Sequence, residues 1–430
     1  MAAACFFPSS YQKQKISHSP KILIAKDTRL SSDMLESALA AGITSMGVDA
    51  ILCGCLPTPG AAFLTRSMHA NGGIVISASH NPANDNGIKF FNAQGGKLED
   101  NQENLIEELL DNEAKFDHRP CGTSTGKILH LPDAIGRYCE FAKSSFPRHL
   151  SLEGIHIAVD CANGAASQST PAILKELGAT LTVINSSPDG RNINKNCGST
   201  HPQAIQKLVL DCQAHLGIAH DGDADRCLLC DEKGAILDGD DILAIAGINL
   251  LHAGKLAKNT IVATVMSNFA LDEFFASHNA HVIRTPVGDR HIIAQLESDQ
   301  LNLGGEQSGH IVFRDFTTTG DGIITALQIL RIIAETGEPL SKLKSLLQKF
   351  PQAHRNIKVT HKPPIESLGN VCRLLDQLQS QLAGRGRTLL RYSGTEPKIR
   401  LLIEGPDRSL IENWADEIAA AIQSAIGAPD

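Results

Sequence analysis

The sequence lacks the features that would direct a protein to a membrane or to nucleic acid. Its 430 residues contain no apolar run close to the ~20 residues that a membrane-spanning helix needs. The apolar part of the opening MAAACFFPSS is too short for a secretory signal peptide. Basic residues never form a long run and the net charge is -8, which argues against nucleic acid as a partner. We therefore expect a cytoplasmic protein with a small-molecule ligand, and local cations can still build a pocket for an anion.

The eleven cysteines are scattered and form neither a zinc pattern nor a disulfide framework. The only C-x-x-C spacing, Cys227 to Cys230, lies in an apolar run typical of a strand. It has no second pair and no histidine at the spacing of a zinc site. An odd number of cysteines in a chain of this size is typical of a reducing compartment. We interpret these two cysteines as core residues.

The composition is that of a globular protein of several domains. With 42% hydrophobic and 20% charged residues the chain can bury a large core, and its length corresponds to about three domains. Strand-like and helical segments alternate in three cycles, which begin at Lys21, Ile155 and Thr260. This alternation predicts α/β units with largely parallel sheets.

We therefore predict an α/β protein of three similar α/β (mixed-sheet) domains plus a C-terminal α+β domain around a central cleft. No Gly/Ser-rich linker separates the blocks, so we expect them to pack closely. The predicted domains are residues 1–150, 151–254, 255–353 and 354–430.

The most informative stretch is IVISASHNPANDNGIKFF, residues 74–91. Its first three residues predict a buried strand that delivers a polar loop to a fixed place. In that loop Ser79 offers a hydroxyl beside the imidazole of His80, with the amine of Lys89 nearby in sequence. A hydroxyl next to a base or a cation can act as a nucleophile. Judged on residue types alone, a serine-rich turn that only caps backbone hydrogen bonds is the commoner explanation.

A second polar loop, HDGDADR, follows the strand-like run Leu216 to Ala219. Its three aspartates, Asp221, Asp223 and Asp225, can converge on one hard cation, and oxygen ligands favour Mg²⁺ or Ca²⁺ over zinc. An EF-hand is disfavoured because Arg226 stands where that loop requires glycine, and a strand precedes it. A surface turn is a weak alternative, because neighbouring carboxylates repel each other without a cation. Arg226 adds a charge suited to phosphate.

Two further polar loops end strand-like runs. GGEQSGH carries Glu306, Ser308 and His310, a set that suits sugar hydroxyls, although a polar hairpin turn explains it equally. RYSGTEP carries Arg391 and Ser393 and can cradle a phosphate, although a solvated turn explains it equally. Ligands bind outside the carboxyl ends of strands in α/β sheets, so four such loops together favour a ligand site.

In this order the motifs SASHNP, DGDADR, GEQSGH and RYSGTEP resemble the four motif loops of the α-D-phosphohexomutase family. The resemblance runs from about Lys21 to the C-terminus. GEQSGH, with KDTR at Lys26 to Arg29, is most similar to the branch of bacterial phosphoglucosamine mutases, whereas relatives that act on mannose or glucose phosphates typically differ at Gln307. The resemblance implies conversion of glucosamine 6-phosphate to glucosamine 1-phosphate, which feeds UDP-N-acetylglucosamine and cell-wall synthesis. A phosphomannomutase/phosphoglucomutase and a non-catalytic phosphosugar-binding relative are the two alternatives.

The resemblance also implies a role for each motif residue. Ser79 would carry the phosphoryl group, and one Mg²⁺ per chain would be held by Ser79, Asp221, Asp223 and Asp225. Proton transfer or charge balance would involve His80, Lys89 and Arg226. The sugar would be read by Glu306, Ser308 and His310. The phosphate that does not react would be held by Arg391, Ser393, Gly394 and Thr395. Glucose or glucosamine 1,6-bisphosphate would prime the enzyme, and a homodimer is compatible with this prediction.

Three positions depart from the family pattern. Ala224 stands where the family usually has glycine, which is tolerable if its φ is negative. Pro286 stands where some relatives have lysine, so no catalytic lysine is assigned there. Residues 1–20 are irregular and lack a GTDGIRG-like opening motif. We therefore expect the first domain to lack its opening strand, its opening helix and one phosphate-contacting arginine, with a loss of stability and of substrate binding.

Overall fold

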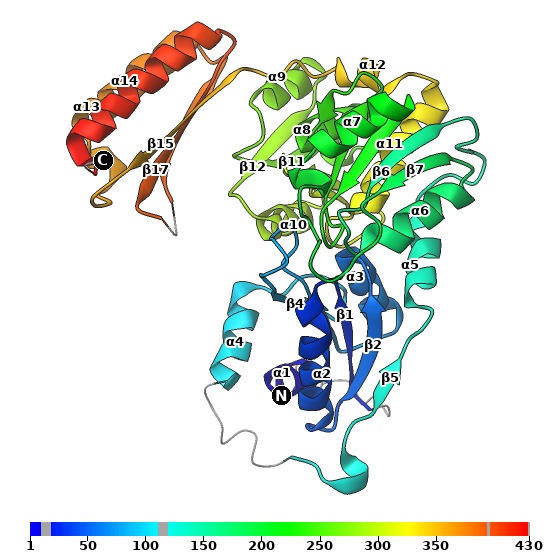
Figure 1. Cartoon of the computed structure of the whole chain (residues 1–430). Helices are drawn as coiled ribbons and strands as arrows, with labels where there is room; N and C mark the ends of the chain where they lie inside the picture. Colours follow the sequence, from blue (N-terminus) through cyan, green and yellow to red (C-terminus); the bar gives the residue numbers. More distant parts are fainter. Residues whose placement is uncertain (10–18, 111–118, 394–395, 429–430) are drawn as a thin grey trace. The chain divides into compact units, whose positions relative to one another are not determined.

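The computed structural model describes residues 1–9, 19–110, 119–393 and 396–428 (Figure 1). The chain forms two compact units, Met1–Ser267 with His278–Leu346, and Asn268–Ser277 with Leu347–Asp430. The first unit holds three mixed sheets and the second holds an antiparallel sheet. Each sheet is built from one consecutive stretch of chain, as the alternation of strands and helices predicted.

The first sheet has the strand order β4-β3-β1-β2-β5. Its parallel strands are β1 (Lys21–Lys26), β2 (Asp49–Cys55), β3 (Gly72–Ile76) and β5 (Ile128–His130), and β4 (Ile88–Asn92) pairs antiparallel to β3. Helices pack on both faces because successive residues of a strand point to opposite sides. A Cβ on Gly72 would meet the ring of Phe7, whereas a Cβ on Gly73 would meet Thr65 of α3 (Thr58–Ser67). The other helices of this part are α2 (Leu30–Thr44) and α4 (Asp100–Leu110).

The first residues form a helix, so the expectation that residues 1–20 are irregular is wrong for this segment. α1 (Ala2–Ser9) buries three alanines and Phe7 against β1, β3 and α2. Its small residues give no clear periodicity in the sequence, but they allow a close approach to the sheet. The absence of an opening strand and of a phosphate-contacting arginine stays a prediction.

The second sheet has the order β10-β9-β8-β6-β7 and the third has the order β12-β11-β13-β14. The parallel strands of the second sheet are β6 (His156–Asp160), β7 (Thr180–Ile184) and β8 (Leu216–His220), followed by the antiparallel β9 (Cys227–Asp231) and β10 (Ile236–Leu237). Those of the third are β11 (Thr260–Thr264), β12 (His281–Thr285) and β13 (Leu303–Gly305), with the antiparallel β14 (Ile311–Phe313). Their helices are α6 (Ala166–Glu176), α7 (Gln203–Cys212), α8 (Gly239–His252), α10 (Asp289–Ser298), α11 (Gly322–Thr336) and α12 (Leu340–Lys344).

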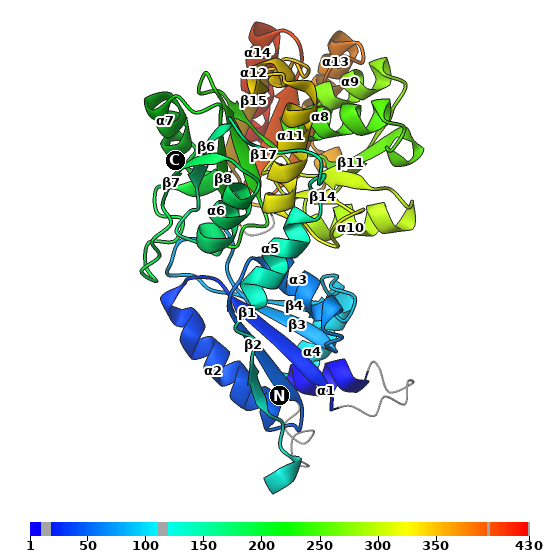
Figure 2. The same ribbon diagram turned by 90° about the vertical axis from the view of Figure 1, so that its right-hand side faces the viewer.

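One helix connects the parts of the first unit. Figure 2 shows α5 (Ala134–Lys143) beside α3, α6 and α11. Its fully buried Tyr138 donates a hydrogen bond to the carboxylate of Asp321, with 3.0 Å to each oxygen, at the start of α11. This bond ties the connecting helix to the third sheet's helices.

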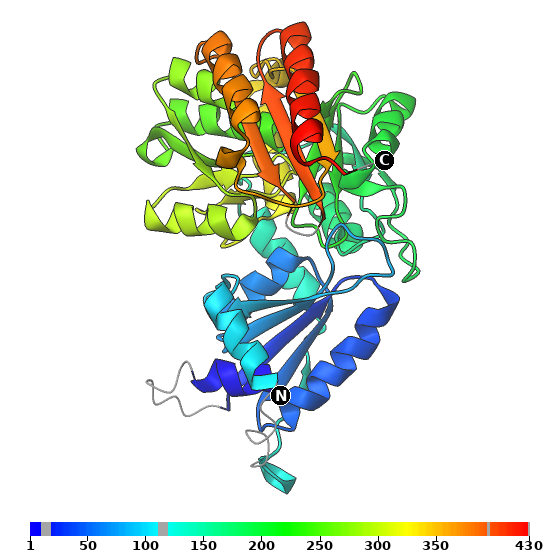
Figure 3. The same cartoon turned by 90° about the vertical axis from the view of Figure 1, so that its left-hand side faces the viewer.

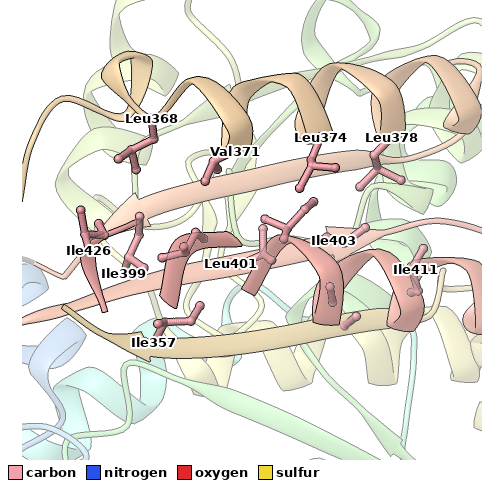
Figure 4. Packing of buried hydrophobic residues seen from close by; sticks show 14 of the residues in the cluster. Ile357, Leu368, Val371, Leu374, Leu378, Ile399, Leu401, Ile403, Ile411 and Ile426 are labelled. Carbon is pink, nitrogen blue, oxygen red and sulfur yellow. The ribbon is translucent and has the colours of Figure 1, made fainter. Parts of the chain in front are cut away.

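The second unit is an α+β domain. Its sheet, in the order β15-β17-β16, consists of β15 (Gln352–Lys358), β16 (Arg387–Tyr392) and β17 (Lys398–Glu404). Figure 3 shows α13 (Gly369–Leu382) and α14 (Arg408–Ile426) side by side over it. Alternate residues of β17, among them Leu401 and Ile403, face Leu374 and Leu378 of α13 (Figure 4). The short α9 (Ala270–Ser277) belongs to this unit, and the preceding Asn268 donates a hydrogen bond from Nδ2 to the carbonyl oxygen of Phe350 (3.0 Å).

The cysteines behave as core or surface residues. All eleven lie within the described residues and are unpaired. Cys227 and Cys230 are buried in β9, and burial raises the pKa of the Cys230 thiol to about 12. Over the same described parts of the chain, we find no helix with the length and apolar character needed to cross a membrane.

Replacing Phe7 by alanine should destabilise the first domain by about 3–5 kcal/mol, because it opens a cavity against the sheet. The measurement is the urea midpoint of the transition that reports on this domain. Phe6→Ala is the matched control, because that neighbouring side chain is only half-buried and should cost less. Equal losses for the two variants would contradict the packing of α1.

Candidate active site

Three of the four polar loops that the sequence analysis singled out meet within the first unit. They follow β3, β8 and β13 at the carboxyl ends of these strands. Ser79 Oγ donates a hydrogen bond of 2.7 Å to Asp221 Oδ2, across 142 positions of the sequence. The serine loop of the first sheet and the aspartate loop of the second are therefore in direct contact.

The aspartate loop brings three carboxylates to one point. Asp221 and Asp223 are fully buried, Asp225 is 4% exposed, and one oxygen of each lies within 4.8 Å of the others. Asp223 Oδ1 and Asp225 Oδ1 are buried and accept no hydrogen bond from the described residues. Oxygen ligands with open lone pairs fit a hard divalent cation such as Mg²⁺.

The pKa shifts of the aspartates also favour a bound cation. Burial and the neighbouring charges of Asp225 and Asp223 raise the pKa of Asp221 well above its usual range. Burial alone would also raise the pKa of Asp225, but the positive charges of Lys89, Lys97 and Arg226 lower it. Added positive charge at this point would favour the ionised form of all three carboxyl groups.

Two cationic side chains border the aspartates. Lys89, on β4, places Nζ 2.6 Å from Asp223 Oδ2 and 3.5 Å from Asp225 Oδ2. Burial lowers the pKa of Lys89, but Asp223 and Asp225 raise it more, so the amine stays charged. Arg226 Nε lies 3.9 Å from Asp225 Oδ1. Both residues are therefore at hand to balance negative charge beside Ser79.

His80 is the neighbour of Ser79 in the sequence, but it is not the hydrogen-bond partner of the serine hydroxyl. Its side chain is exposed, while the hydroxyl of Ser79 is bonded to Asp221 and not to the imidazole. Partial loss of hydration and the charge of Arg226 lower the pKa of His80. The imidazole is thus neutral at physiological pH and next to the serine without being its hydrogen-bond partner.

The loop after β13 lies against the aspartate loop. Cys227 N donates to Gly309 O (3.0 Å), and Gly309, at φ +90°, leaves no room for a Cβ there. The carboxylate of Glu306 accepts hydrogen bonds from Gly288 N (3.1 Å) and from Ser308 Oγ (3.2 Å). It is therefore fixed in place as a hydrogen-bond acceptor.

His310 connects this loop to the aspartates. Its ring is buried, and Nε2 lies 4.0 Å from Asp225 Oδ2 and 3.6 Å from Asp289 Oδ2. Lys97, from the first sheet's part of the chain, forms an ion pair with the same Asp289. Lys97 and Asp289 are site residues that the sequence analysis missed.

The fourth loop belongs to the second unit. Arg391 is half-buried on β16, and Ser393, at 5% exposure, follows it. The carbonyl oxygen of Ser393 accepts a hydrogen bond from Lys362 Nζ (2.6 Å), and its hydroxyl accepts one from Glu396 N (3.3 Å). The predicted phosphate contacts Gly394 and Thr395 lie outside the described residues.

A buried ion pair supports the serine loop. Asp27 and Arg29 follow β1 and are joined by an Nε to Oδ2 contact of 2.9 Å. Ser77 donates from Oγ to Asp27 Oδ2 (2.6 Å) and accepts from the backbone N–H of Ser79 (2.9 Å). In the sequence, KDTR served only as part of a resemblance. Two opposite charges directly after an apolar strand are the signal that could have indicated this ion pair.

The structure corrects the expectation for Ala224. Its φ is +58°, in the left-handed region, although the methyl group was expected to require a negative φ. The residue is fully buried, and its carbonyl oxygen accepts a hydrogen bond from Gly322 N (3.0 Å). Contacts with the start of α11 therefore hold alanine in a conformation that favours glycine.

Sequence profiles of known families match the chain along nearly its whole length. All four describe phosphoglucomutase/phosphomannomutase. The matches are α/β/α domain I at residues 3–117, domain II at 136–234, domain III at 238–350 and the C-terminal domain at 347–421.

Individual relatives agree with these profiles. A protein of Anaeromyxobacter sp. is 49% identical over 422 residues, which cover 97% of this chain and 90% of that protein. One of Myxococcus xanthus is 49% identical over 409 residues, covering 95% and 89%. Both carry the name phosphoglucosamine mutase.

Solved structures share the fold. A phosphoglucomutase/phosphomannomutase family protein of Burkholderia thailandensis superposes with a TM-score of 0.78 at 23% identity, covering 99% of this chain and 93% of that one. N-acetylphosphoglucosamine mutase of Aspergillus fumigatus, solved with GlcNAc-6P and magnesium, superposes with a TM-score of 0.65 at 20% identity, covering 86% and 92%. A variant of that fungal enzyme was solved with glucose 1,6-bisphosphate (TM-score 0.63, 19% identity, 99% of each chain). With its four matching domains and its near full-length relatives, the chain belongs to the phosphoglucomutase/phosphomannomutase family.

Proposed function

We propose that the protein is a phosphoglucosamine mutase that converts glucosamine 6-phosphate to glucosamine 1-phosphate through a phosphoserine at Ser79. The observation that carries this proposal is the 2.7 Å hydrogen bond between Ser79 Oγ and Asp221, beside a cluster of three buried carboxylates. The names of the relatives at 46–49% identity support the same activity. The unpaired cysteines support a reducing compartment, the cytoplasm.

In the first transfer, the 1-hydroxyl of glucosamine 6-phosphate attacks the phosphorus atom of phosphoserine, and the bond to Ser79 Oγ breaks. The proton that the hydroxyl loses ends on Ser79 Oγ. The 1,6-bisphosphate then presents its other end, and Ser79 Oγ attacks the phosphorus atom of the 6-phosphate. The bond from phosphorus to O6 breaks, O6 takes up the proton that Oγ loses, and glucosamine 1-phosphate is left. Such transfers depend on positioning and on charge neutralisation. Lys89 and Arg226 supply fixed positive charge beside the aspartates. Asp221, Asp223 and Asp225 would hold one Mg²⁺, which when bound neutralises charge on the phosphoryl oxygens.

The remaining motif residues would handle the sugar. Glu306 and Ser308 would read hydroxyl groups, since the carboxylate is already oriented by two hydrogen bonds. His310 would contact the sugar next to the metal loop, because its ring lies close to Asp225. Arg391, Ser393, Gly394 and Thr395 would hold the non-reacting phosphate. A homodimer and the exact domain boundaries stay predictions.

Purified protein should convert glucosamine 6-phosphate to glucosamine 1-phosphate in a coupled assay primed with glucose 1,6-bisphosphate. It should prefer this substrate over mannose 6-phosphate and glucose 6-phosphate, as Gln307 beside Glu306 suggests. Comparable kcat/KM on mannose 6-phosphate would favour a phosphomannomutase/phosphoglucomutase. Binding without turnover, even after priming, would favour a non-catalytic phosphosugar-binding protein.

Active protein should carry one phosphate on Ser79, because this hydroxyl is the one bonded to the aspartate cluster. Intact mass and peptide mapping before and after incubation with substrate measure it. Ser79→Ala should abolish both the phosphate and the transfer. A phosphate found only on Ser77, with Ser79→Ala still active, would refute the assignment.

Asp223→Asn should remove Mg²⁺ binding while the fold persists, since the change keeps the volume and the backbone hydrogen bond from Thr58 N to Asp223 O (3.0 Å). A ligand that binds only the native state raises its melting temperature, so Mg²⁺ should stabilise the wild type and not the variant. Activity should lose its Mg²⁺ dependence in parallel. Asp211→Asn, at an exposed aspartate of α7, is the control and should respond to Mg²⁺ as the wild type does. An unchanged Mg²⁺ response in Asp223→Asn would show that the metal site lies elsewhere.

A further inference from the structure

The backbone of the serine loop is held by two side chains from different parts of the first unit. Arg29 donates from Nη2 to the carbonyl oxygens of Ser79 (3.1 Å) and Asn81 (2.8 Å). Asn194 donates from Nδ2 to the same two oxygens, at 2.8 Å and 3.0 Å. Each carbonyl group therefore accepts two hydrogen bonds, one from a residue after β1 and one from a residue of the loop after β7.

Asn194 is itself fixed. Its side chain is only 6% exposed, and its φ of +57° is one that asparagine tolerates better than most residues. Its backbone N–H donates to Ala162 O (2.9 Å). The amide is thus presented to the serine loop from a rigid base in the second sheet's part of the chain.

The serine needs such support because its own backbone is strained. Ser79 has a φ of +50°, which persists in a non-glycine residue only when its surroundings over-determine it. Ser77 holds its N–H, while Arg29 and Asn194 hold its C=O. With both sides of the residue pinned, only rotation about χ1 is left to the hydroxyl.

The contact between the Asn194 amide and the Ser79 carbonyl group also sets the distance between the serine loop and the aspartate loop. Gly222 passes so close that a Cβ on it would lie 2.6 Å from Ser79 O and 2.8 Å from Asn194 Nδ2. Asp221 and Asp223 flank this glycine on the chain. A shift of the asparagine amide would therefore move the serine relative to the carboxylates that face it.

We propose that Asn194 is a positioning residue for phosphoryl transfer at Ser79. Together with Arg29 it fixes the Ser79 and Asn81 carbonyl groups, and so holds Oγ against Asp221 in the geometry that both transfers use. This inference rests on the proposed function. It predicts an effect on the transfer step and not on sugar binding, because Asn194 contacts the serine loop and not the loop that carries Glu306.

The test compares Asn194→Gly with Asn196→Gly. Both replace an asparagine in the left-handed region by a residue that fits it, so both change the backbone entropy alike. Asn196 is exposed and, among the described residues, forms no hydrogen bond with the serine loop. A misplacement of about 1 Å costs roughly 100-fold in rate, so Asn194→Gly should lower kcat for glucosamine 6-phosphate by about 10- to 100-fold at an unchanged KM. Asn196→Gly should keep both constants.

Hydrogen exchange of the peptide that contains residues 79–85 gives a readout independent of turnover. Exchange should be faster in Asn194→Gly and unchanged in Asn196→Gly. Equal kcat values for the two variants, or a fall in kcat that follows a raised KM, would overturn the proposal. If Asn194→Gly does not fold, Asn194→Asp keeps the size and tolerates the φ, and it places an acceptor against both carbonyl oxygens. If exchange is faster only in Asn194→Gly, but the wild-type protein does not turn over the sugar, the proposed function is refuted. Asn194 would then be shown to hold the backbone of the serine loop, without a role in transfer.

Discussion

Three carboxylates buried within 4.8 Å of one another are the constraint on which the first unit depends. Their burial and mutual repulsion raise the pKa of Asp221, so the cluster needs positive charge to stay ionised. Lys89 brings that charge from β4 of the first sheet. His310, after β13 of the third sheet, places its ring 4.0 Å from Asp225. The open oxygens of Asp223 and Asp225 fit a divalent cation in addition. The three sheets therefore meet at the carboxylates, and the first sheet supplies a positive charge that complements them.

A strained residue lies on each side of this meeting point. Ser79 at φ +50° and Ala224 at φ +58° lie on the two loops that the Ser79–Asp221 hydrogen bond joins. Each such conformation costs on the order of 1–3 kcal/mol in a residue other than glycine. Hydrogen bonds from Gly322 and Asn194 offset that cost locally. These two strained residues therefore lie where the two loops must approach each other closely.

Some features of the fold and of the site follow from local sequence patterns, and others depend on tertiary contacts. The strand that ends before Ser79 and the aspartates after β8 were predictable, because an apolar run followed by polar residues is a local pattern. The partner of the Ser79 hydroxyl was not, since His80 is its neighbour in sequence whereas Asp221 is 142 positions away. The role of Phe7 depends on the space beside Gly72, and no periodicity in eight residues reveals it. The positive φ of Ala224 was likewise not predictable, because alanine disfavours it and tertiary contacts impose it.

Arg29 shows why a costly buried charge is retained under the serine loop. A guanidinium removed from water is tolerated only when its N–H groups are satisfied. Here Asp27 accepts from Nε, and four carbonyl oxygens, those of Ser79, Asn81, Pro82 and Asp85, accept from the two Nη atoms. Lysine could not reproduce this planar set of donors. An apolar pair in place of Asp27 and Arg29 would avoid the desolvation cost, but it would leave four carbonyl groups without these donors. The pair therefore contributes less to stability than to the shape of the loop, and that shape fixes where the Ser79 hydroxyl meets the aspartates.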